Sequence, residues 1–166
     1  MSRIPEFIDP TELHSINIAE DLAVAREWEH DRVTEDQIAL AIEGQWRTYS
    51  LTLAWSSQDE TLRLICTFEC EWPTQIQELY SLLNLVNDKV WTGAFTYWSD
   101  QKLMVWRYGL LLSGDQIVMP EQVDDMIASA VMACERFYPA FQLAGWGGHT
   151  AADAIRVVVS DGHGRA

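Results

Sequence analysis

Apolar and polar residues alternate in three consecutive segments of the chain. The apolar positions run from Ile38 to Ile42, from Tyr49 to Trp55 and from Leu62 to Cys70. Short polar stretches separate them, first Gly44-Gln45 and then residues 56–60. A period of two in neighbouring segments with short connections predicts an antiparallel meander of three strands, covered on one face.

Two further strands are predicted later in the chain, from Ala94 to Trp98 and from Leu103 to Leu112. The second is apolar at both alternating sets of positions, which is typical of a strand buried between two layers or of one that offers a patch to a partner. Helices are expected on only one face of this sheet. A second copy of the chain or a bound peptide would then cover the other face.

A period of three to four residues predicts the first two helices. The first begins at Asn17, which pairs with Glu20 in a capping-box pattern, and reaches Trp28. The second follows Pro73, with Thr74 and Gln77 as another capping box, and continues to Val90. Gly93 is expected as the C′ residue that ends it.

A third helix is predicted from Pro120 to about Tyr138. Pro139 is expected to kink or stop it, because proline lacks the N–H that the helix needs, so that residues 140–146 form a short extension. Thr150 and Asp153 then cap a last short helix that ends near Val159.

This order of elements, α-βββ-α-ββ-α(-α), predicts an α+β fold with an antiparallel sheet of about five strands. The predicted organisation is a flexible lead-in over residues 1–15, a single domain over 16–160 and a disordered tail over 161–166.

The formal net charge of −14 makes nucleic acid and anionic membranes poor partners, because binding to phosphates depends on Lys and Arg. No apolar run approaches membrane-spanning length, so no membrane association is expected. Three scattered cysteines suit a reducing compartment, which indicates a cytoplasmic protein.

Reactive groups are sparse. Cys134 lies on the apolar stripe of the third helix, and Cys66 and Cys70 share a strand face with leucine and phenylalanine, so all three are interpreted as buried structural residues. No histidine shares a helix face with a second ligand at metal-binding spacing. The sequence therefore predicts a protein that is not an enzyme and has neither metal nor cofactor.

Aromatic residues are abundant, with eight Trp in 166 residues. Trp and Arg are enriched among the residues that dominate binding at interfaces, which favours a protein or peptide client and a homodimer. The candidate contacts are Trp46, Arg47, Trp98, Trp106 and Arg107. The alternative is a small-molecule pocket near the third helix that would use Arg136, Tyr138 and Trp146.

Long aromatic-rich stretches carry a family resemblance. They include Gly44-Gln45-Trp46, residues 83–87 with Trp91, and residues 134–142 followed by Trp146-Gly147-Gly148. In these stretches the chain resembles the YbjN-like family of bacterial sensory transduction regulators. The resemblance implies a fold similar to that of type III secretion chaperones, which are small acidic proteins that bind a client polypeptide, and it supplies no catalytic residues.

Overall fold

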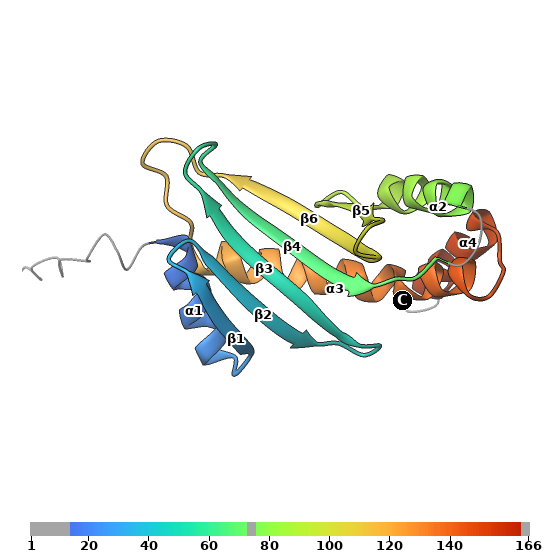
Figure 1. Ribbon diagram of the computed structural model, residues 1–166, viewed down its shortest axis with the longest axis horizontal. Helices are drawn as coiled ribbons and strands as arrows, with labels where there is room; N and C mark the ends of the chain where they lie inside the picture. The colour runs from blue at the N-terminus through green and yellow to red at the C-terminus, as the bar shows by residue number, and fades with distance from the viewer. Residues whose placement is uncertain (1–13, 73–75, 164–166) are drawn as a thin grey trace, which may run out of the picture.

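A six-stranded antiparallel sheet forms the centre of the computed structural model, which describes residues 14–72 and 76–163 (Figure 1). The strands lie in the order β1-β2-β3-β4-β6-β5. Their bounds are β1 (Glu29–Thr34), β2 (Gln37–Glu43), β3 (Thr48–Ser56), β4 (Thr61–Glu69), β5 (Ala94–Trp98) and β6 (Leu103–Leu111).

Four helices are described, and they are distributed unevenly around the sheet. Their bounds are α1 (Ser15–Ala25), α2 (Ile76–Lys89), α3 (Pro120–Gly145) and α4 (Ala151–His163). In Figure 1, α1 and α3 lie behind the sheet, while α2 and α4 gather at one end of α3. No helix of the described part lies on the near face, which we call the outer face. None of the described helices combines the length and apolarity needed to cross a membrane.

The hydrophobic core fills the space between the sheet and α1 and α3. The alternating positions predicted from the sequence, such as Leu40, Leu51 and Leu64, are buried there. Aromatic rings join the layers, because Phe95 contacts Phe137 at a centroid distance of 6.0 Å. The prediction of an α+β fold with an antiparallel sheet is confirmed.

The sheet has one strand more than expected, β1, which precedes β2 and gives the order α-ββββ-α-ββ-α-α. Arg32 of β1 donates to Asn17 (2.9 Å) and pairs with Glu20 (3.1 Å), so these two residues of α1 bind the strand. The predicted capping box at Asn17 is therefore wrong. The N-cap is His14, whose Nδ1 accepts the N–H of Ile16 at 3.2 Å, and the helix ends before Trp28.

Helix α3 continues past Pro139 to Gly145, so the expected stop at Pro139 is wrong. Proline removes one backbone hydrogen bond, but Ala140, Phe141 and Ala144 continue the buried face of the helix against the core. Burial on both sides of the proline holds the helical conformation.

Two other helix ends differ from expectation. Helix α2 stops at Lys89, four residues before Gly93, which instead precedes β5. The predicted cap at Thr74 lies outside the described residues. The Thr150 hydroxyl does accept the N–H of Asp153 at 3.2 Å, as predicted, and α4 continues to His163. The first three residues of the expected tail are thus helical, while 164–166 and 1–13 lie outside the described residues.

Candidate functional site

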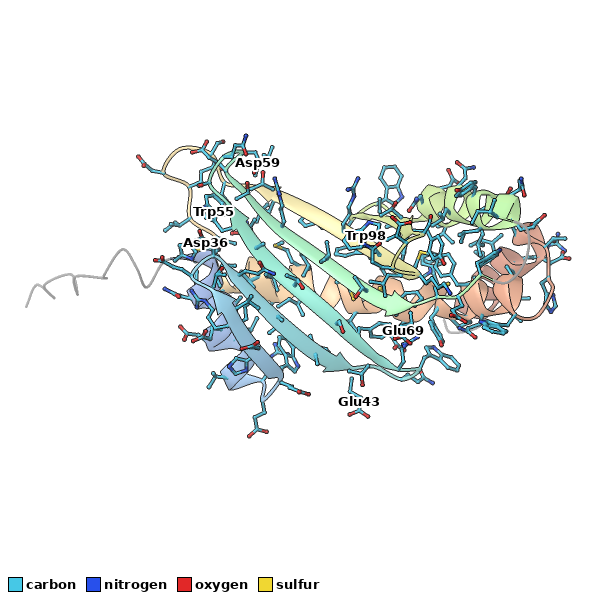
Figure 2. All side chains as sticks on the ribbon, viewed as in Figure 1. Asp36, Glu43, Trp55, Asp59, Glu69 and Trp98 are labelled. Atoms are coloured by element: carbon cyan, nitrogen blue, oxygen red, sulfur yellow. The ribbon has the colours of Figure 1, made fainter. Side chains whose placement is uncertain are left out.

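The outer face of the sheet carries mainly small and β-branched side chains. Because paired residues of antiparallel strands point to the same side, these positions form one continuous surface. They include Ala39, Ala41, Ser50, Thr52, Ala54, Ile65, Thr67, Ala94 and Thr96. Figure 2 shows the labelled carboxylates Asp36 and Asp59 at one end of the strands and Glu43 and Glu69 at the other. Short side chains leave a surface on which an extended polypeptide can lie.

A groove of about 460 Å³ opens on this face where β4, β5 and β6 meet. Arg63 and Arg107 line it together with Trp98, whose side chain is 36% exposed. The remaining lining residues are Thr61, Leu64, Ile65, Gly93, Ala94, Tyr108 and Gly109. No carboxylate belongs to the lining, although the chain contains 25 acidic residues. We call this feature the arginine groove.

The two guanidinium groups of the arginine groove differ in their partners. Arg63 pairs with Asp59 at 2.5 Å, and hydrogen bonds from Ser56 and Arg63 hold the pKa of the Asp59 carboxyl below its ordinary value. Arg107 is exposed and has no carboxylate partner among the described residues. An anionic ligand would therefore find one free guanidinium and one shared with a solvent-exposed carboxylate.

Trp98 and Arg107, two of the five predicted contacts, thus come together in the arginine groove, while sequence reasoning missed Arg63. The signal for Arg63 was its place in β4 between Leu62 and Leu64, which both face the core. A charged residue in that phase must point to the outer face.

Trp46 and Arg47 lie elsewhere, at the β2–β3 hairpin. The Trp46 N–H donates to Oε1 of Glu135 in α3 at 3.4 Å. The Arg47 guanidinium lies 5.8 Å from the ring centroid of Tyr138 and donates to the Glu69 carbonyl at 3.1 Å. These contacts attach the hairpin to α3, at a distance from the arginine groove along the strands.

Trp106 is fully buried, which corrects its prediction as a partner contact. Its ring stacks on Tyr108 with a centroid distance of 6.2 Å, and its indole lies against Gly93. Trp106 shares its phase in β6 with Met104, so it points toward the helix-covered face rather than the outer face.

The alternative pocket residues are not brought together. Arg136 lines a cleft of about 450 Å³ with Trp91 and Met132, and its guanidinium lies 4.8 Å from the Phe137 ring centroid. Tyr138 instead faces Arg47. Trp146 is the exposed C-cap of α3. The structure does not assemble one small-molecule site from Arg136, Tyr138 and Trp146.

The thiols are structural. Cys66, Cys70 and Cys134 are free and buried, as predicted. The Sγ atoms of Cys134 and Cys66 lie 3.6 Å apart, and that contact together with burial raises the pKa of Cys134 far above the ordinary value. Burial raises the pKa of Cys70 to about 11. A nucleophilic thiol needs access to solvent, and all three cysteines are buried.

Comparisons with known proteins show the family and the fold of the chain. The family model described as "putative bacterial sensory transduction regulator", YbjN, matches residues 17–143. A chaperone from the solved HopA1–SchA chaperone–effector complex superimposes with a TM-score of 0.50 and 16% sequence identity, covering 75% of this chain and 93% of that chain. No curated protein matches the chain.

Proposed function

Because the chain belongs to the YbjN family and folds like a type III secretion chaperone, we propose that it is a non-enzymatic, chaperone-like regulator that binds another polypeptide. The observation that carries this proposal is the outer face, a broad sheet surface that no helix of the described part covers. The three free thiols favour a reducing, cytoplasmic setting.

The chemistry of the outer face suits a peptide better than a small metabolite. Thr52 and Thr67 offer hydroxyl groups and small side chains over a wide area, while the arginine groove adds one deeper feature beside it. Polypeptides that bind in extended conformation gain main-chain hydrogen bonds and place alternate side chains in such depressions. A metabolite site would need an enclosed cavity with convergent polar groups.

A photo-crosslinking side chain placed at Thr52, on the outer face, is expected to give a discrete adduct with one client protein inside the cell. The matched control is the same group at Ser81, an exposed position on α2. Mass spectrometry of the adducts identifies the client. Equal labelling from the two positions, or none from Thr52, would contradict polypeptide binding on this face.

We further propose that the chain forms a homodimer through its helical side, the surface of α3 around Met132 together with Trp91. Trp91 is 98% exposed and Met132 is 70% exposed, and both line the cleft between α3 and the segment that follows α2. Large apolar side chains that stand together in water indicate an interaction surface. Because this surface does not include the outer face, a second copy bound there leaves the outer face free for a client.

Met132→Glu is expected to convert the dimer into a monomer, since it buries an unpaired charge in the proposed interface. Light scattering after size-exclusion chromatography measures the change in mass. Val157→Glu, an equivalent change at an exposed position of α4, is expected to leave the dimer intact. A monomeric wild-type protein, or a dimer that survives Met132→Glu, would refute this interface.

A further inference from the structure

Strand β6 is longer than its outer neighbour β5, which leaves part of its edge open. β5 pairs with Leu103–Arg107 only, whereas β4 pairs with the whole of β6, from Leu103 to Leu111. Residues 108–111 therefore have a strand partner on one side alone. The arginine groove lies at this step between the two strands.

The hydrogen-bond pattern shows which backbone groups point toward the open side. The Leu112 N–H donates to Glu60 at 2.8 Å, and the Lys102 carbonyl accepts from Cys70 at 2.9 Å, so even-numbered residues of this segment bond toward β4. Odd-numbered residues consequently face the other way. The N–H and C=O groups of Gly109 and Leu111 thus point beyond the end of β5, where the described residues supply no partner.

The neighbouring edge of β5 is occupied at its centre, Phe95. The Asn87 side chain of α2 accepts the Phe95 N–H at 2.8 Å and donates to the Phe95 carbonyl at 3.0 Å. These are the two bonds that an added strand would make with Phe95. At the opposite end of the sheet, Glu29 and Asp31 of β1 project on the outer face as paired neighbours of alanines. The open part of the β6 edge, by contrast, is unpaired, and residues 108–111 include no carboxylate.

Gly109 leaves the outer side of the open edge without a side chain of its own, next to two arginines. On the outer face it lies directly opposite Arg63 in β4 and two residues from Arg107 in β6. Because glycine has no side chain, an outward-pointing side chain on an added strand opposite Gly109 would reach over it to both guanidinium groups. Charge-assisted hydrogen bonds from arginine to carboxylate are short and strong. An acidic side chain fits this position, and a basic one would be repelled.

We propose that the client polypeptide binds here as an added β-strand, an extended acidic segment that pairs with Gly109 and Leu111 and places a carboxylate between Arg63 and Arg107. This inference rests on the proposed polypeptide-binding function and specifies its partner. Trp98, which also lines the groove, would pack against the apolar part of the same segment.

Two synthetic ten-residue peptides test the chemistry of the segment, one alternating Glu with Val and the other alternating Lys with Val. Titrated into the full-length protein, the acidic peptide is expected to shift the amide NMR signals of Gly109 and Leu111 and to slow their hydrogen exchange. Affinity should fall as salt is added, because the carboxylate contacts are exposed. Equal binding of the two peptides, changes confined to the helical side, or no binding at millimolar peptide would overturn the proposal.

Two variants test separately the contact of the peptide carboxylate with arginine and the backbone pairing with β6. Arg107→Glu is expected to weaken binding of the acidic peptide by at least about tenfold, in line with a lost charge-assisted hydrogen bond. Leu111→Pro is expected to weaken it as well, because its N–H faces the open side and is not needed by the sheet. Arg156→Glu, the same charge change at an exposed site of α4, is the matched control. Undiminished affinity in Arg107→Glu would overturn the proposal, and circular dichroism verifies that each variant is folded.

The crosslinks from Thr52 separate this inference from the function on which it rests. If the client still crosslinks to Thr52 in the Arg107→Glu variant with unchanged yield, polypeptide binding stands and the acidic-strand inference fails. If wild-type Thr52 gives no adduct, the proposed polypeptide binding on the outer face fails. A yield that falls in Arg107→Glu but not in Arg156→Glu supports both.

Discussion

Gly93→Ala is expected to destabilise the protein by roughly 2–5 kcal/mol, a large part of the stability of a domain of this size. Gly93 has φ = 74°, a left-handed conformation that residues with a Cβ rarely adopt. A Cβ at this position would also overlap the indole of Trp106. The indole has little room to move, because Trp106 is fully buried and stacked on Tyr108. Urea unfolding followed by circular dichroism measures the loss.

Gly114→Ala is the matched control for this prediction. Gly114 has a similar φ of 69°, but a Cβ there would have no atom within 4 Å. The substitution should cost only about 1–2 kcal/mol, the penalty for the left-handed backbone. The difference between the two variants therefore isolates the contact of Gly93 with Trp106. Equal losses would mean that the indole moves aside without penalty.

The sequence predicted those elements whose burial is periodic. β2, β3 and β4 alternate because one face of each packs on the core, and that pattern is local. β1 was missed because it is an edge strand whose residues Glu29, His30, Asp31 and Arg32 are all polar, so it has no alternation to detect. Its position depends on pairing with β2 and on the contacts of Arg32 with α1, which no local pattern reveals.

The candidate site was predicted only in part, for a related reason. Trp98 and Arg107 were named because Trp and Arg favour interfaces, but Trp106 has the same chemistry and is buried. Only the phase of β6 relative to the helices distinguishes Arg107 from its neighbour Trp106. Arg63 was missed because it meets Arg107 through the pairing of β4 with β6, between residues 44 positions apart in the sequence. Pairing over such a separation cannot be deduced from one sequence.

Trp106→Ala is the second substitution with a large expected effect, a loss of about 3–5 kcal/mol in the free energy of unfolding. The side chain is 0% exposed, and it packs in the hydrophobic core against Gly93. Its indole N–H has no hydrogen-bond partner among the described residues, so the loss comes from apolar contacts and the cavity that remains. Urea unfolding by circular dichroism measures it without relying on tryptophan fluorescence.

Trp98→Ala provides the contrast that separates core from binding surface. Trp98 is 36% exposed at the end of β5 and lines the arginine groove, so its removal should change stability by less than about 1 kcal/mol while weakening binding of the acidic peptide. Trp106→Ala should show the reverse wherever it remains folded, with peptide affinity close to that of the wild type. If Trp106→Ala kept its full stability and lost the peptide, Trp106 would belong to the binding surface, which would contradict its burial on the helix-covered face.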